Sequence, residues 1–195
     1  MVDEVALGRE FFETLEQLDA EIAAQVAAQR CPRCDGPLHR GDYDRKPRGA
    51  ALAPSGEAFA RRISLCCGRE GCRRRATPPS VRFLGRRVYL GAVVILASVV
   101  ALHVTAAEAL LRTTAVPVRT VRRWLAWWHG PFVRTSVFVA LAARLPGLTR
   151  SELPAALVAR MPGEGAARVR WLLLWLAPLT TTSVTDGARF LRGLG

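Results

Sequence analysis

Lysine is almost absent from this 195-residue chain, and carboxylates are scarce in its C-terminal part. Lys46 is the only lysine, and after residue 112 the only acidic residues are Glu152, Glu164 and Asp186. A two-metal nuclease needs several carboxylates on a rigid sheet, and no strand-rich stretch surrounds these three. A glycine-rich phosphate loop and a Ser/His/Asp grouping are lacking too. These absences predict a protein that is not an enzyme.

The positive charge of the chain is large and consists almost entirely of arginine. The formal net charge is +12 and the isoelectric point is about 11.1. A field of this sign attracts polyanions such as DNA, RNA or an anionic membrane surface. Compositional bias toward arginine, alanine, glycine and proline gives the same charge. The charge therefore favours nucleic-acid binding without identifying a site.

The first region, residues 1–30, predicts an amphipathic helix over residues 3–29 that packs or dimerises. Its apolar residues recur at helical spacing, and they are Phe11, Leu15, Leu18, Ile22 and Val26. Its carboxylates lie off that stripe, and they are Glu13, Glu16, Asp19 and Glu21. This start is acidic rather than basic and then apolar, so it is not typical of a secretory signal. We expect a cytoplasmic, nucleoid-associated protein that is able to form an oligomer.

The second region, residues 31–85, predicts a small β zinc ribbon. Cys31 and Cys34 form a CxxC pair, and Cys67 and Cys72 form a CxxxxC pair. Disulfides are rare in the cytosol, where spaced cysteine pairs are typical metal ligands. Four thiolates complete a tetrahedral structural zinc site and leave no position for water. A redox CxxC motif and unrelated core cysteines are the alternatives.

The fifth cysteine, Cys66, competes with Cys67 as the third ligand. If Ile63, Leu65 and Cys67 share one face of a strand, Cys66 points the other way. That alternation favours Cys67 and leaves Cys66 as the alternative. His39 is a further candidate ligand, although a surface or strand position explains it more simply.

Basic residues crowd the second cysteine pair. Arg73, Arg74 and Arg75 follow Cys72 directly. Because a zinc ribbon is small, these arginines would share one surface and suit DNA phosphates. Solvated arginines without a ligand are the alternative.

The third region, residues 86–130, predicts a helical domain that opens with an apolar run. Residues 88–107 carry no formal charge. An uncharged, mostly apolar segment of this length is long enough to span a bilayer. His103 lies inside this run, and Thr105 with Glu108 matches a capping box that starts a new helix. A buried helix is therefore favoured over a membrane span.

A helix-turn-helix is predicted at the end of this region. Residues 105–114 form the first helix, residues 115–117 the turn and residues 118–129 the second helix. The buried face of the second helix is predicted at Val118, Val121, Leu125 and Trp128. Other side chains of the second helix lie off that face and are able to contact base edges and phosphates in a major groove. They are Arg119, Thr120, Arg122 and Arg123.

The fourth region, residues 131–195, predicts a C-terminal set of helices. They are expected at residues 136–144, 151–161 and 166–176, separated by Pro-Gly or proline positions. Trp171 and Trp175 stand four residues apart in an apolar helix. They are predicted to be core residues rather than platforms for stacked bases.

The combined motifs resemble the zinc-ribbon and helix-turn-helix front end of bacterial insertion-sequence transposases and their accessory proteins. The resemblance covers roughly residues 31–130 and rests on the CPRCDG run at Cys31, the Cys67–Cys72 pair with its three arginines, and the RTVRRW run at Arg119. Pro117 stands where that family usually has a serine cap; proline still suits a first helical turn. The resemblance implies binding to transposon-end DNA, whereas the family's separate catalytic domain is missing here.

The sequence thus predicts a mainly α protein with a small β zinc ribbon and a following helix-turn-helix. Its predicted function is DNA binding as a zinc-containing accessory protein, linked to a mobile element or to transcriptional control, with a separate transposase or recombinase subunit as a partner. A non-catalytic protein-interaction adaptor and a small membrane protein with a cytosolic zinc ribbon are the alternatives.

Overall fold

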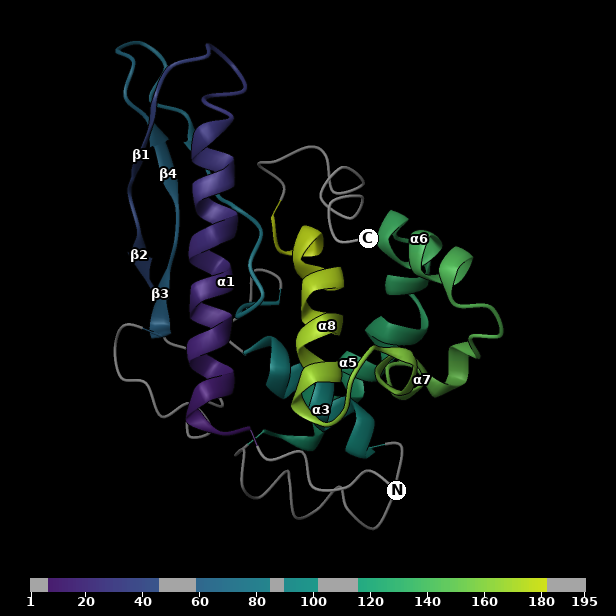
Figure 1. The fold of residues 1–195 in the computed structure, drawn as a ribbon. Helices are drawn as coiled ribbons and strands as arrows, with labels where there is room; N and C mark the ends of the chain where they lie inside the picture. Colours follow the sequence, from purple (N-terminus) through teal and green to yellow (C-terminus); the bar gives the residue numbers. More distant parts are fainter. Residues whose placement is uncertain (1–6, 46–58, 85–89, 102–115, 182–195) are drawn as a thin grey trace.

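The computed structural model describes residues 7–45, 59–84, 90–101 and 116–181. It is mostly helical with two small antiparallel sheets, which confirms the coarse fold class (Figure 1). The helices are α1 (Arg9–Ala28), α3 (Gly91–Ala101), α5 (Val118–His129), α6 (Ser136–Arg144), α7 (Ala155–Arg160) and α8 (Ala166–Leu176), with 3-10 turns η2 (Phe132–Arg134), η3 (Arg150–Glu152) and η4 (Ala177–Thr180). The strands are β1 (Leu38–Arg40), β2 (Tyr43–Asp44), β3 (Arg61–Arg62), β4 (Leu65–Cys67) and β5 (Arg75–Ala76).

Helix α1 buries a wider face than the sequence predicts. Of the predicted stripe, Leu18 is only half-buried and the other four residues are buried. Phe12 and Asp19 are buried as well, at 0% and 1% exposure. Asp19 was expected off the buried face, so that expectation is wrong. A buried carboxylate needs hydrogen-bond donors, and residues 80–82 supply them to Asp19.

The two sheets form a module beside α1 that contains both cysteine pairs. The larger sheet has the order β1-β4-β5, with Leu38 opposite Cys67 and Leu65 opposite Ala76, and the smaller one pairs β2 with β3. Val26 of α1 packs against Leu65 and Ala76. The strand-like run at residues 62–65 is split, because Arg62 ends β3 and Leu65 begins β4.

Helix α3 lies within the long apolar run. Its residues from Ala92 to Val99 are all buried, and it lies against α5 and α8. Among the described residues, no helix combines the length and apolar character needed to cross a bilayer. The capping box at Thr105 and the predicted helix at residues 105–114 lie outside the described residues.

The remaining helices follow the sequence closely. The bounds of α5, α6 and α8 match the predicted ranges. The range 151–161 is instead divided into η3 and α7, because Pro154 lacks an N–H and restricts the residue before it. Trp175 is buried and Trp171 is half-buried against the same core, as expected of core residues.

One hydrophobic core takes residues from each of the four predicted regions. It includes Phe12 of α1, Phe83 before α3, Trp128 of α5 and Leu173 of α8. Trp128 is fully buried, and its indole Nε1 donates a hydrogen bond to Ser98 Oγ of α3 at 3.2 Å. Helix α5 is therefore fixed to α3 by both packing and a buried polar contact.

A buried ion pair joins α1 to the segment before α3. Arg82 Nε lies 2.8 Å from Asp19 Oδ2, and both side chains are at most 2% exposed. Asp19 also accepts hydrogen bonds from Ser80 Oγ at 2.6 Å and from the Val81 amide at 2.7 Å. The other guanidinium nitrogens of Arg82 donate to backbone oxygens of Phe59 and Arg61.

We expect Asp19→Asn to lower the free energy of unfolding by about 3–5 kcal/mol, because it leaves the guanidinium of Arg82 buried without a compensating charge. Urea denaturation measures the change. Glu13→Gln is the matched control, since Glu13 is exposed on the same helix, and it should change stability little. Equal midpoints for the two variants would refute the role assigned to Asp19.

Candidate metal centre

The first cysteine loop is a tight turn closed by backbone hydrogen bonds. The Cys31 amide donates to Gly36 O at 2.9 Å, and the Asp35 amide donates to Cys31 O at 2.8 Å. Asp35 has a φ of 54°, a region that asparagine and aspartate tolerate better than most residues. A Cβ at Gly36 would lie 2.9 Å from Cys67 Sγ and 3.3 Å from Cys34 Sγ. Only glycine lets the loop come this close to the sulfurs.

The second cysteine loop continues from strand β4. The Cys67 amide donates to Arg74 O at 2.9 Å, and the Gly68 amide donates to Pro37 O at 2.9 Å. Gly71 has a φ of 78°, which favours glycine. The loop thereby returns toward β5 and brings Cys72 back over Cys31.

These two loops bring the four predicted cysteines together. The sulfurs of Cys31 and Cys72 are 3.8 Å apart, those of Cys34 and Cys67 are 3.5 Å apart, and all four lie within 4.8 Å of one another. Four sulfurs bound about 2.3 Å from one zinc ion are roughly 3.8 Å from each other. The donor set and its spacing therefore fit a tetrahedral metal ion.

The pKa values of Cys31 and Cys67 are shifted in opposite directions. The backbone amides of Arg33 and Cys34 donate to the sulfur of Cys31 and, despite its burial, lower its pKa to about 7. The amide of Arg69 likewise lowers the pKa of Cys67, but burial and the three neighbouring thiols outweigh it and raise that pKa to about 12. Without a cation the cluster thus disfavours the thiolate of Cys67, whereas a bound cation would stabilise the thiolate form of its ligands.

Cys66 and His39 lie outside this cluster. Cys66 points away from it, and its Sγ donates to Arg73 O at 3.4 Å. His39 is the cross-strand partner of Cys66 and is exposed. The exposure of β4 alternates, with Leu65 and Cys67 buried and Cys66 half-buried, as the strand argument for Cys67 requires.

The cysteine loops are rich in arginine. Residues 30–36 and 68–75 contain six arginines and two carboxylates, an excess of four positive charges. Arg73, Arg74 and Arg75 are exposed. Arg69 flanks the second cysteine pair, where the sequence suggests only phosphate binding; it donates from Nη1 to Cys34 O at 2.9 Å and so ties the second loop to the first. Its position between the paired cysteines is the only sequence signal for that contact.

Helix α5 carries the other predicted DNA contacts. Arg119, Arg122 and Arg123 are exposed, and Thr120 is half-buried. Val121 and Trp128 are buried as predicted, Leu125 is only half-buried, and Val118 is 53% exposed. The expectation for Val118 is wrong because the buried face begins only at Val121.

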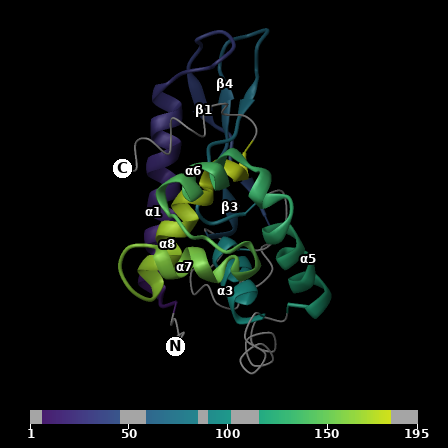
Figure 2. The same ribbon diagram turned by 90° about the vertical axis from the view of Figure 1, so that its right-hand side faces the viewer.

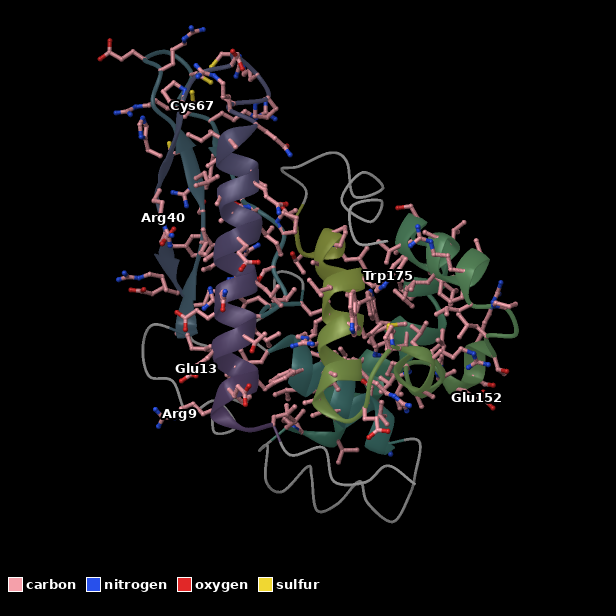
Figure 3. The ribbon with its side chains drawn as sticks, viewed as in Figure 1. Arg9, Glu13, Arg40, Cys67, Glu152 and Trp175 are labelled. Carbon is pink, nitrogen blue, oxygen red and sulfur yellow. The ribbon has the colours of Figure 1, made fainter. Side chains whose placement is uncertain are left out.

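The structure does not bring the two sets of basic residues together. Figures 1 and 2 show the cysteine loops beyond the C-terminal end of α1, whereas α5 lies in the helical body. In Figure 3, Cys67 marks that end of the molecule, far from Trp175 and Glu152 in the body. The cysteine cluster and α5 are thus separate features of the fold.

Comparison with known proteins finds no matching family model, curated protein or solved structure.

We expect the wild-type protein and the Cys66→Ser variant to retain about one zinc ion per chain, and the Cys67→Ser variant to lose it. The two substitutions are adjacent and chemically identical, but only Cys67 belongs to the sulfur cluster. Metal analysis after gel filtration measures the difference. Loss of zinc from Cys66→Ser with retention in Cys67→Ser would reverse the assignment.

Proposed function

We propose that this protein is a non-catalytic DNA-binding accessory protein whose small module is held together by a structural zinc ion. The observation that carries the DNA-binding part is the exposed face of α5. Arg119, Arg122 and Arg123 stand at positions i, i+3 and i+4 of this helix and are all exposed. The opposite side, at Val121 and Trp128, is buried. A basic helix anchored in this way can enter the major groove with its arginine side chains directed toward the DNA.

Zinc is the metal that the donor set favours. Cys31, Cys34, Cys67 and Cys72 are all soft thiolate ligands at tetrahedral spacing. The ion would contribute folding free energy to the module and, with four protein ligands, would have no open position for catalysis. The excess arginines of the two loops would offset the negative charge of the metal–thiolate group.

In the proposed complex the two basic regions have different roles. Arg119, Thr120, Arg122 and Arg123 of α5 face the groove, where arginine and threonine side chains contact base edges or phosphates. Arg73, Arg74 and Arg75, at the end of the second cysteine loop and the start of β5, bind phosphates. The scarcity of carboxylates after residue 112 supports a role without catalysis of its own.

We also propose a link to a mobile element, because the cysteine and arginine motifs resemble those of transposase front ends. In that setting the protein would bind element-end DNA in the nucleoid, and a separate transposase or recombinase would carry out strand transfer. Transcriptional control uses the same DNA-binding surface.

We expect Arg122→Ala to weaken binding to duplex DNA and to reduce the slope of log affinity against log salt concentration by about one, because one phosphate contact is lost. Fluorescence anisotropy across a salt series measures both quantities. Arg9→Ala is the control, since Arg9 is an exposed helical arginine distant from α5 (Figure 3). A salt series for Arg122→Ala that overlays the wild type would contradict the role given to α5.

A further inference from the structure

The β1-β4-β5 sheet has one face on α1 and a second face that carries polar side chains. Leu65 and Ala76 pack against Val26 of α1. The adjacent row across the three strands consists of His39, Cys66 and Arg75, which are exposed or half-buried. Side chains alternate along a strand, so this row belongs to the face turned away from α1.

Arg75 on this row is positioned by an aromatic ring. Its guanidinium carbon lies 5.8 Å from the centroid of the Tyr43 ring, and Arg45 lies 5.7 Å from the same centroid. Arg75 Nη1 also has long contacts of 3.5 Å to Gly41 O and 3.4 Å to Ser64 Oγ. A guanidinium over a tyrosine face is held in orientation while its charge remains uncompensated.

The carboxylates of the neighbouring turn and strand are engaged by other arginines. Asp42 accepts from Arg40 Nη2 at 2.5 Å and from the Ser64 amide at 3.2 Å. Asp44 lies 3.4 Å from Arg61 Nε. Among the described residues, Arg75 has no carboxylate within ion-pair distance.

We propose that Arg75, held over Tyr43 on the sheet face turned away from α1, binds the phosphodiester backbone of nucleic acid. This inference rests on the proposed DNA-binding function. The sequence already suggests Arg75 as a phosphate contact, and the structure adds Tyr43 as the residue that positions it on the sheet. A guanidinium presents five donors in a planar fork, and the fork matches a phosphate group. Arg73 and Arg74 precede Arg75 in the chain and are exposed, so the basic strip continues from the cysteine loop onto the sheet.

The test compares five variants of the full chain, namely Arg75→Ala, Tyr43→Leu, the double variant that combines these two changes, Tyr43→Phe and Arg150→Ala. Arg150 is an exposed arginine in the helical body and serves as the matched control. Affinity is measured against a duplex and a single strand of the same sequence over a salt series. Zinc content and the urea midpoint of each variant report on folding.

We expect Arg75→Ala to reduce the salt slope by about 0.9 on duplex or about 0.7 on a single strand, depending on which form supplies the phosphate. Tyr43→Leu should weaken binding in the same way, Tyr43→Phe should retain wild-type binding because the ring remains, and Arg150→Ala should change nothing. The effects of Arg75→Ala and Tyr43→Leu should be non-additive, because the ring acts through the guanidinium.

Two results overturn this inference. One is a wild-type salt slope in a folded, zinc-containing Arg75→Ala variant whose parent binds nucleic acid. The other is full additivity of Arg75→Ala and Tyr43→Leu. If Arg122→Ala still weakens binding in either case, the proposed function stands and only the sheet contact is lost. Loss of slope in Arg75→Ala without an effect of Arg122→Ala would instead support the sheet face and remove the role of α5.

Discussion

The closure of two loops onto four sulfurs is the constraint on which the sheet module depends. Beneath the sheet, the only buried apolar cluster described consists of Val26, Leu65 and Ala76, with Ala27 and Leu38 at its edge. Strands of two or three residues bury too little surface to offset the entropy of ordering the loops. A metal ion bound across both loops would supply the missing free energy, and it would also fix the arginines that these loops carry.

The second constraint is the polar junction between this module and the helical body. Arg82 donates to Asp19 and to the backbone oxygens of Phe59 and Arg61, and Arg62 is buried on the carbonyls of Ile63 and Pro78. A planar guanidinium satisfies several acceptors at once, which an ammonium group does less well. Part of the arginine content is therefore structural. The net charge of the chain is thus larger than the positive charge that its surface offers to a polyanion.

Local sequence patterns predicted much of this fold, but they could not predict contacts between residues that are far apart in the sequence. The bounds of α5, α6 and α8 followed from apolar periodicity and proline positions, and strand alternation separated Cys67 from Cys66. The same patterns could not show that Asp19 is buried, because its partners Ser80 and Arg82 lie more than sixty residues further along the chain. They also could not place Tyr43 beneath Arg75, since that contact depends on the pairing of distant strands.

The most direct measurement of the central claim is X-ray absorption at the zinc edge of the purified protein. The account predicts a first shell of four sulfur atoms at about 2.3 Å, with no nitrogen or oxygen ligand. A shell containing nitrogen would bring His39 into the site and contradict the cluster described above. A protein that folds fully without bound metal would contradict the dependence of the module on its four cysteines.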